Sequence, residues 1–577
     1  MTKPKKLTAR HCAGGTDVGT GVFNIKPEQN IEARNMEYGI NGEAITSLGY
    51  DDVGMDWGEN GSKIDGLHKV ENYPNLVFSA VNGKIKYADF TAAPQSSASV
   101  YNVDTALSLT AGNPVFMKSY RGMIYYCNGV EPLGRVAIGQ VRTTFSAAAT
   151  PIVMNYAEGY KFTNGADKVY CEGDEIDYTG VSTDNLTGVT NNLGHSAGAY
   201  VTQHNTVSSG QKGTTIAIFR DTMFVGGITD EPGVLRYGKT VDTVGNINNL
   251  HDFSDGNNYI IGDGGAITAL QSTETRLYVF LKDKVHFIQT VFDTSGNQVF
   301  DVSRLFTGVY GCPNPYCVVE MEDVVLFFTG KRLIRIGYDP NGQILIPDEN
   351  FDREILPLLQ QADEDQTNAR LVYNPATKEL RLKYIVNGVA KVIKYHKQLD
   401  KFSKFADEDA SCYLVHRKNT YFGDIGNDIV WKIGKSIDSE GDNTAHRYHT
   451  GRIDGGTKNL KLFKRGRVSG KKNVGSSVYV LTKIDGKNFG AARLIPESCM
   501  DLSAAATPLG EAVIGGDEIG LSGDANNLFP YTYKFLLGRR GKDYSFAISS
   551  DESGAIWSID GYDVEWEESD SEPRTNY

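Results

Sequence analysis

Short apolar runs separated by polar turns recur along most of this 577-residue chain. In the clearest copy, residues 276–281 alternate between two faces, residues 282–284 form a polar turn, and residues 285–288 resume the alternation. A period of two is typical of β-strands, so each copy predicts a β-hairpin. Related copies occur at residues 76–87, 115–129, 216–227, 323–336, 370–395 and 412–433. Repetition of small antiparallel sheets favours an all-β fold, namely a β-propeller with its sheets around one axis.

Glycine content and the scarcity of helical patterns agree with this fold class. The chain has 63 glycines, about 11% against a usual ~7%, which suits a protein with many tight turns. One segment, residues 352–361, has helical spacing, and Asp352 is placed to cap it. Pro357 falls in its first turns, so any helix there is short.

Changes in residue composition and periodicity along the chain suggest three regions. Residues 1–70 show little periodicity and predict an extended amino-terminal arm and loop, and residues 71–435 carry the hairpins of the propeller. Within the propeller, residues from about 131 to 213 are rich in Ala, Thr, Asn and Gly, which predicts a loop-rich insertion. A polar stretch at residues 437–443 predicts a linker. The remaining region, 436–577, contains two strand-rich halves and is predicted to form a β-sandwich.

Charge and cysteine usage narrow the possible partners and cofactors. The formal charge of −13 argues against a protein that coats nucleic acid, but not against a passage through which DNA slides. No apolar run approaches the roughly 20 residues of a membrane-spanning helix. Of seven cysteines, only Cys312 and Cys317 lie close together, and no second pair completes a zinc site. We therefore expect reduced thiols and predict no metal and no cofactor.

Acidic residues crowd one glycine-rich loop, but their spacing does not indicate a catalytic or calcium site. The five residues are Asp51, Asp52, Asp56, Glu59 and Asp65. Calcium loops place oxygen ligands at alternating positions and close with a bidentate carboxylate, and this loop does not keep that spacing. Solvated turn residues are the favoured interpretation, although a structural calcium stays an open alternative. Catalytic motifs for hydrolases, zinc proteases or nucleotide-binding enzymes are missing from the sequence, so we predict that the protein is not an enzyme.

One basic run stands out in this acidic chain. Its residues are candidates for a partner interface: Lys461, Lys464, Arg465, Arg467, Lys471 and Lys472. The simpler interpretation is a solvated hairpin, and the alternative is a contact with an acidic partner or with DNA phosphate. Near the carboxy terminus, residues 563–572 are acidic. We therefore considered a head-to-tail contact between identical subunits, in which the basic run of one copy meets the acidic tail of the next.

The order of several short motifs resembles a known family, the β-propeller tail nozzle or hub proteins of tailed bacteriophages, also called stabilisation proteins. The amino-terminal part of the resemblance is carried by residues 14–17, 24–27, 32–37 and 47–50. The central part is carried by residues 262–270, the hairpin at 276–288, residues 308–313 and the strand that ends at 326–331. The carboxy-terminal part is carried by residues 541–548 and 559–565. The insertion at about 131–213 departs from the family pattern.

This resemblance implies a function. Members of the family are structural virion proteins, commonly homohexamers, that form part of the viral tail tube or nozzle through which DNA is ejected. The implied partners are further copies in a ring, adjacent tail adaptor or portal-proximal proteins, and double-stranded DNA in transit. The implied location is the virion tail, after assembly in the host cytoplasm. Two alternatives stay open: a receptor- or carbohydrate-binding propeller of the tail, and, less favoured, a propeller glycosidase.

Overall fold

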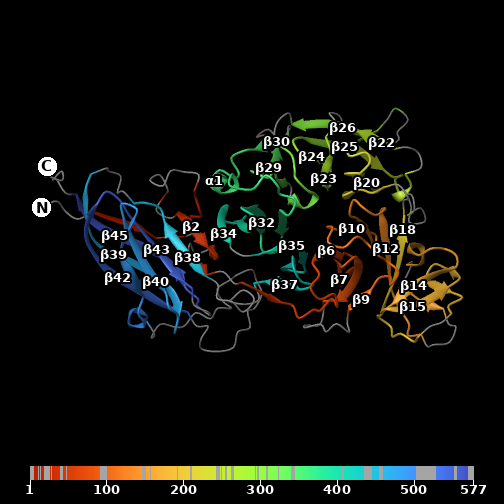
Figure 1. Cartoon of the computed structure of the whole chain (residues 1–577), viewed down its shortest axis with the longest axis horizontal. Coiled ribbons are helices and arrows are strands. Elements are labelled where there is room, and N and C mark those ends of the chain that lie inside the picture. The colour runs from red at the N-terminus through yellow and green to blue at the C-terminus, as the bar shows by residue number, and fades with distance from the viewer. Residues whose placement is uncertain are drawn as a thin grey trace.

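We analysed a computed structural model of the chain, which consists almost entirely of short strands in two lobes (Figure 1). The structure describes residues 5–568 except for a set of short segments: 11, 13, 19–25, 27–28, 39–42, 47–48, 91–99, 146–150, 156–157, 191–192, 208–210, 242–246, 248–249, 254–256, 262–264, 293, 295–297, 307–309, 323, 339–344, 406–407, 435–444, 454–458, 502–527 and 552–554. The predicted linker at 437–443 lies outside the described residues.

The larger lobe contains blade-like antiparallel sheets in chain order. The first is β6 (Ile64–Val70), β7 (Tyr73–Val81), β8 (Lys84–Asp89) and β9 (Val100–Asn102). The second is built on β10 (Phe116–Tyr120), β11 (Met123–Cys127), β12 (Gly134–Gln140) and β18 (Tyr200–Thr206). The third is β19 (Thr215–Phe219), β20 (Thr222–Gly226), β21 (Val234–Tyr237) and β22 (Asn258–Ile260).

Four more sheets complete the lobe. The fourth blade, which contains the clearest predicted hairpin, is β23 (Ile267–Ser272), β24 (Leu277–Leu281), β25 (Val285–Phe292) and β26 (Gln298–Phe306). The fifth is β27 (Val318–Met321), β28 (Val324–Phe328), β29 (Leu333–Tyr338) and β30 (Leu345–Asp348). The sixth is β31 (Arg370–Asn374), β32 (Glu379–Val386), β33 (Val389–His396) and β34 (Lys401–Phe405). The seventh is β35 (Ala410–His416), β36 (Asn419–Asp424), β37 (Val430–Ile433) and β5 (Tyr50–Asp52).

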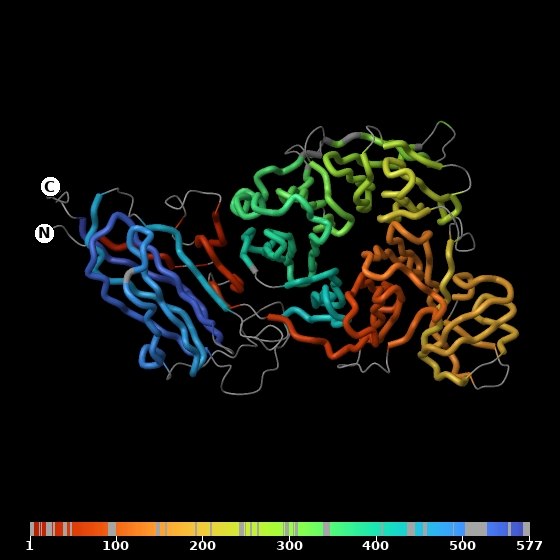
Figure 2. Tube along the Cα trace, in the orientation of Figure 1, coloured from red at the N-terminus to blue at the C-terminus, as the bar shows by residue number. Residues whose placement is uncertain are grey.

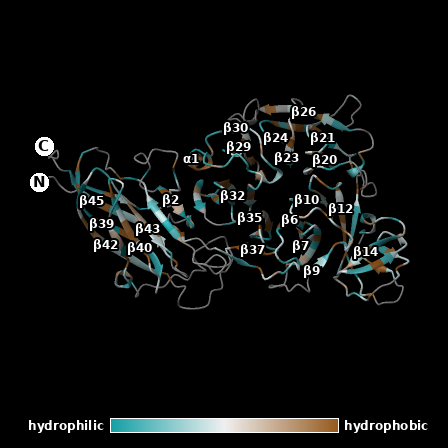
Figure 3. Cartoon of the chain, viewed as in Figure 1, coloured by the Kyte–Doolittle hydropathy of each residue, from teal (hydrophilic) through white to brown (hydrophobic). Residues whose placement is uncertain are grey.

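The first strands of consecutive blades contact one another in a closed cycle. They contact in the order β6, β10, β19, β23, β27, β31 and β35, and β35 contacts β6 again. Buried apolar clusters lie between neighbouring blades; one joins Ile64 and Val77 of the first blade to Leu414 and Val430 of the seventh. In Figure 3 the strands carry hydrophobic segments beside hydrophilic ones, as two-sided packing of short strands requires. Within the described residues the lobe is therefore a seven-bladed β-propeller, which confirms the predicted fold class.

The ring is closed by a strand from the amino-terminal end of the chain. Strand β5 pairs antiparallel with β37, with Tyr50 opposite Ile433 and Asp52 opposite Trp431. The Tyr50 ring meets the rings of Phe422 and Trp431 at centroid distances of 5.0 Å and 5.4 Å. Residues 64–70 then begin the first blade, so the seventh blade is held by segments from opposite ends of the propeller sequence.

This closure predicts the effect of a single truncation. Tyr50→Ala is expected to lower the free energy of unfolding by about 2–3 kcal/mol, because a largely buried aromatic side chain loses its packing on the closing blade. Tyr50→Phe keeps the ring contacts, so its free energy of unfolding should fall much less. Thermal unfolding of both variants measures the difference, and equal midpoints would contradict the role of Tyr50 in closure.

The insertion predicted at about 131–213 is narrower in the structure, because β12 and β18 lie inside that range and are strands of the second blade. The inserted region is the segment between these two strands. It contributes β13 (Ile152–Val153), β14 (Asp167–Cys171), β15 (Asp174–Tyr178), β16 (Gly180–Val181) and β17 (Asn185–Thr187), with a 3-10 turn at Gly159–Lys161. Strands β14 and β15 extend the second blade beyond β18, and β13, β17 and β16 form a small separate sheet. Its side chains share one buried cluster with the blade, including Phe145, Met154 and Phe162.

The smaller lobe is a sandwich of two sheets with a small third sheet. One, here called the outer sheet, is ordered β1 (Lys5–Ala9), β45 (Gly561–Glu568), β39 (Lys461–Asn473) and β42 (Leu528–Gly541). The other contains β2 (Asn30–Arg34), β38 (His446–Thr450), β43 (Tyr544–Ser550), β40 (Tyr479–Ile484) and β41 (Lys487–Leu494). The third is β3 (Met36–Tyr38), β4 (Ala44–Thr46) and β44 (Ser558–Ile559). A single apolar cluster joins these sheets.

The amino-terminal residues are integrated into both lobes rather than extending as an arm. Strand β1 pairs with β45, so that Lys5 lies opposite Trp566. Strand β2 pairs antiparallel with β38 of the sandwich and parallel with β34 of the sixth blade. One nine-stranded sheet thus runs from the sixth blade into the sandwich.

Buried ion pairs reinforce this connection between the lobes. Lys394 of β33 lies 2.6 Å from Glu37 of β3 and 2.5 Å from Glu379 of β32, and its side chain is 1% exposed. Burial alone would raise the pKa of Glu379, but the nearby Lys394, Arg381 and His396 lower it to about 2. Glu379 is therefore ionised at neutral pH, and the charge of Lys394 is matched inside the protein.

The predicted helix is present but shorter than expected. Helix α1 spans Leu356–Leu359, and its N-cap is Ile355 rather than Asp352. Asp352 instead accepts a 3.0 Å hydrogen bond from the backbone N–H of Leu333 and lies 2.8 Å from Arg332. The prediction of Asp352 as the cap was therefore wrong, because a buried carboxylate is satisfied here by a neighbouring strand rather than by the helix terminus.

Candidate functional site

The predicted basic run forms β39, a strand near the centre of the outer sheet, between β45 and β42. Three of the predicted residues pair with β45 across the sheet. Lys464 lies 2.5 Å from Glu567, Arg465 lies 2.5 Å from Glu565, and Arg467 lies 2.6 Å from Asp563. Arg465 is directly opposite Glu565 and Arg467 is directly opposite Asp563 in the antiparallel pair, where opposite charges stabilise the register, whereas Lys464 lies in a bulge between Phe463 and Arg465.

The other predicted residues do not all share this exposed face. Lys461 is buried and donates to the carbonyls of Asn459 (3.0 Å) and Lys542 (3.1 Å). Lys472 is also buried and donates to the carbonyls of Ser476 (2.8 Å) and Ile495 (3.2 Å). Lys471 is half-buried, and its backbone N–H donates to Ser558 Oγ. Lys461 and Lys472 therefore satisfy buried carbonyls and are not available to a partner.

The part of the predicted acidic tail that the structure describes, residues 563–568, is the partner of the basic run within the same chain, and residues 569–572 lie outside the described residues. Strand β45 holds Asp563, Glu565, Glu567 and Glu568, and these carboxylates pair with β39 and β1. The carboxylates on which that head-to-tail hypothesis depended therefore form ion pairs within one subunit. A role for Lys464, Arg465 and Arg467 in subunit contact stays a prediction.

The outer sheet nevertheless carries an excess of positive charge. Its four strands hold eleven Lys and Arg and four Asp and Glu, a formal balance of +7 in a chain of −13. The basic side chains also lie above the acidic ones: Arg465 is 65% exposed and Glu565 21%, while Arg467 is 43% exposed and Asp563 7%. A partner that approaches the sheet meets guanidinium and ammonium groups first.

Several residues of this surface were missed by sequence reasoning. Lys534, Leu536 and Arg540 lie on β42, and Leu536 is opposite Arg465. Lys6 of β1 lies 3.1 Å from Asp563. We call the exposed side of the outer sheet the basic face, and define it by Lys6, Lys464, Arg465, Arg467, Lys534, Leu536 and Arg540. The Lys534 to Arg540 stretch is a visible basic signal in the sequence, but its position beside β39 depends on long-range pairing.

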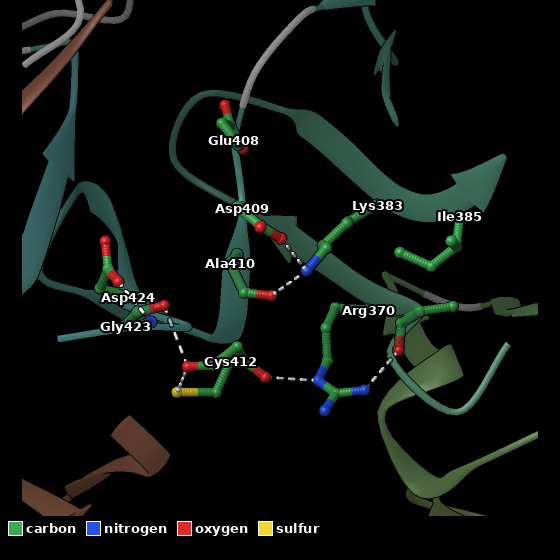
Figure 4. Close-up of polar contacts among 12 residues, drawn as sticks. Arg370, Lys383, Ile385, Glu408, Asp409, Ala410, Cys412, Gly423 and Asp424 are labelled. Carbon is green, nitrogen blue, oxygen red and sulfur yellow. Dashed lines mark hydrogen bonds and ion pairs between the residues drawn. The ribbon is translucent and has the colours of Figure 1, made fainter. Parts of the chain in front are cut away.

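A second charged cluster lies where the sixth and seventh blades meet near their first strands (Figure 4). Arg370 Nε donates to the carbonyl of Ser411 (2.5 Å), and its Nη1 donates to the carbonyls of Thr367 and Ala369 (2.8 Å each). Lys383 Nζ lies 2.8 Å from Asp409 and 2.7 Å from the carbonyl of Ala410. Because Arg370 is 2% exposed and Lys383 is buried, these groups join two blades rather than present a surface.

The acidic loop singled out in the sequence has internal partners. Glu59 lies 2.7 Å from Lys84 and 2.8 Å from Lys86. Burial would raise the pKa of Glu59, but these two lysines and Asn82 lower it to about 2. Asp52 and Asp56 each accept a hydrogen bond from a backbone N–H two residues on, the arrangement expected of turn residues.

The close cysteine pair consists of two separate buried thiols. Cys312 Sγ donates to the carbonyl of Asn314 and Cys317 Sγ to that of Ala369. Burial raises the pKa of the Cys312 thiol well above its usual value. Across the part of the chain that the structure describes, no group of three or more His, Cys, Asp or Glu side chains is placed to hold a metal ion. That same part contains no helix long and apolar enough to cross a membrane.

Comparison with known proteins gives structural neighbours but no relatives by sequence. No family model and no curated protein matches the chain. One similar solved structure is the Dos1 propeller, with 8% identity, 69% of this chain and 96% of that chain covered, and a TM-score of 0.33. Another is apo AztD from Citrobacter koseri, with 10% identity, 67% and 86% coverage, and a TM-score of 0.31.

A third neighbour is an enzyme. The exo-beta-1,3-galactanase from Phanerochaete chrysosporium, solved with galactose, has 10% identity, covers 80% of this chain and 98% of its own, and has a TM-score of 0.19. With scores this low, the propeller assignment rests on the strand order and blade contacts of the chain itself.

Proposed function

We propose that this protein is a non-enzymatic structural component of a bacteriophage tail, part of the tube or nozzle through which DNA leaves the virion. The order of sequence motifs along the chain supports the assignment to this family. The proposal includes a ring of copies, six in the related proteins, assembled in the host cytoplasm next to adaptor or portal-proximal proteins. The lumen of such a ring would pass double-stranded DNA without a sequence-specific site.

The observation that carries this proposal is the continuity of the two lobes. A nine-stranded sheet crosses from the sixth blade into the sandwich, and buried ion pairs of Lys394 flank the crossing. The propeller ring is in turn closed by β5, which follows the strands that the amino-terminal residues give to the sandwich. A building block of a tube must keep its contact surfaces in fixed relative positions, and this architecture fixes them.

The acidic balance of the chain outside the outer sheet also suits a channel component. Subtracting the +7 of the outer sheet from −13 leaves −20 for the rest of the chain. Negative surface repels phosphate, so duplex DNA is not retained during passage. Binding of DNA by a coating protein requires the opposite charge.

Two measurements test the proposed function. Mass spectrometry of purified virions of the phage that encodes the chain should find the protein in a fixed ratio to the portal protein, and electron microscopy of the isolated protein should show rings with a lumen. Absence from virions, or turnover of polysaccharide by the purified protein, would overturn the proposal.

A further inference from the structure

The outer sheet and the β14–β15 hairpin lie at opposite ends of the long molecule (Figure 1 and Figure 2). Residues 167–177 of the hairpin carry five carboxylates and one lysine, a formal balance of −4. The outer sheet carries +7 over its four strands. One subunit therefore has a positive end and a negative end, which cannot meet within the same chain.

The positive end also carries exposed apolar side chains, on the edge strand β42 of the outer sheet and on β41 of the neighbouring sheet. Leu536 is 77% exposed and Leu494 is 47% exposed, and both are among the large apolar side chains most exposed in the described chain. Arg465 lies opposite Leu536 in the sheet, and Arg493 Nη1 donates to the Leu536 carbonyl at 3.0 Å. Exposed apolar side chains that lie next to charged ones are typical of protein interfaces.

The negative end has the complementary arrangement. Leu193 is 61% exposed. Two residues later, His195 has its ring nitrogens 3.3 Å from Glu172 and 3.2 Å from Asp174. These carboxylates are 38% and 39% exposed, so they face solvent while they contact a histidine that is two residues from an exposed leucine.

Two of the cations on the basic face have no ion-pair partner among the residues that the structure describes. Lys534 and Arg540 are exposed, and no described carboxylate lies within ion-pair distance of either. Lys534 is also opposite Arg467, a residue of like charge. These two cations form no ion pair with the described residues of an isolated subunit, whereas an acidic surface in contact with β42 would pair with both groups.

We propose that the basic face of one copy docks on the β14–β15 hairpin of a second copy, with Leu536 and Leu193 at the centre of the contact. This inference rests on the proposed function, because it names the surfaces through which the copies of the ring join. The contact uses two different patches, so it is heterologous, and it closes into a ring only if its rotation returns to the first copy.

Three variants test the contact by sedimentation velocity of the full-length protein. The face variant carries Leu536→Ala, Lys534→Ala and Arg540→Ala. The hairpin variant carries Leu193→Ala, Glu172→Gln and Asp174→Asn. The two amide substitutions remove charge but keep the shape of the side chains that contact His195. The control carries Val389→Ala, Lys418→Ala and Lys391→Ala, which remove one exposed apolar group and two cations from the propeller.

We expect the wild type and the control to form the same assembly, and the face and hairpin variants to associate at least tenfold more weakly. A mixture of the face and hairpin variants retains one intact contact per pair, so it should give heterodimers and nothing larger. Raising the salt from about 0.05 M to about 0.5 M should weaken wild-type assembly, because exposed charges are screened. Unchanged thermal unfolding of each variant shows that its fold is intact.

Other outcomes overturn the inference in distinguishable ways. A face variant that assembles as the wild type does removes the proposed contact but leaves the ring, and with it the proposed function. A wild type that stays monomeric at every concentration also overturns it, while the presence of the protein in virions still decides the proposed function. Loss of binding to a short DNA duplex in the face variant, with assembly unchanged, would assign the basic face to nucleic acid instead.

Discussion

Glu408→Ala is expected to lower the free energy of unfolding by about 3–5 kcal/mol, because it leaves the buried guanidinium of Arg381 without its carboxylate. The Glu408 side chain is 0% exposed and that of Arg381 is 3% exposed, and the two are hydrogen-bonded. Tyr413 donates a second hydrogen bond to Glu408 at 2.9 Å. Arg381 belongs to the sixth blade and Tyr413 to the seventh, so the variant also weakens the contact between two blades.

A matched surface pair provides the control for this prediction. Asp348 and Arg335 form an ion pair on the fifth blade in which both side chains are at least 30% exposed. Asp348→Ala should therefore cost less than about 1 kcal/mol. Replacing both buried residues, with Arg381→Met and Glu408→Leu, should recover most of the loss, since no charge is then left unpaired. Urea denaturation, monitored by tryptophan fluorescence, measures the free energy of unfolding of all three variants. Equal losses of this free energy in Glu408→Ala and Asp348→Ala would refute the argument.

Acidification from pH 7.5 to pH 5 is expected to destabilise both lobes through buried histidines. Burial, with help from Lys394, lowers the pKa of His396 in the sixth blade to about 3, and burial beside Lys483, Arg447 and Arg452 lowers the pKa of His449 in the sandwich to about 3. Both side chains are neutral in the folded protein at pH 5, whereas an unfolded histidine with a pKa near 6.5 is charged. The unfolded state therefore binds more protons, and stability falls as the pH falls.

The size of the loss in unfolding free energy follows from the difference between pH 5 and the pKa of histidine in the unfolded chain. Each of these two histidines, 8% and 7% exposed, should cost about 2 kcal/mol between pH 7.5 and pH 5. Burial raises the pKa values of the Asp65, Glu354 and Asp560 carboxyls, and any proton that these groups take up in the folded state opposes the histidine effect. His449→Gln, which cannot be protonated, should reduce the pH-dependent loss by about 2 kcal/mol in urea titrations at the two pH values. A variant with the wild-type slope would show that His449 is charged in the folded state.

Local patterns in the sequence predicted the parts of the fold that are made of local contacts. The alternation at residues 276–288 corresponds to β24 and β25, which pair directly across a short turn. Adjacent strands show their pairing in one window of sequence, because the turn residues and both alternating runs are visible together. The same reasoning recovered the propeller from its successive hairpins.

Contacts between distant segments could not be predicted in this way. Lys5 lies opposite Trp566, and Arg467 lies opposite Asp563. No local pattern distinguishes a basic strand that pairs with an acidic strand of its own chain from one that awaits another subunit. For the same reason the sequence showed the charges of the candidate interface, but not that Lys461 and Lys472 are buried. Nor did it show that Lys534 and Leu536 lie opposite Arg467 and Arg465.

The parallel pairing between β2 and β34 has a mechanical consequence. It consists of one register position, Arg34 opposite Lys404, whereas β2 and β38 pair over four positions. Under tension between the lobes, backbone bonds that are few rupture before those that are many. The molecule should therefore part first between β34 and β2, with the amino-terminal strand remaining on the sandwich.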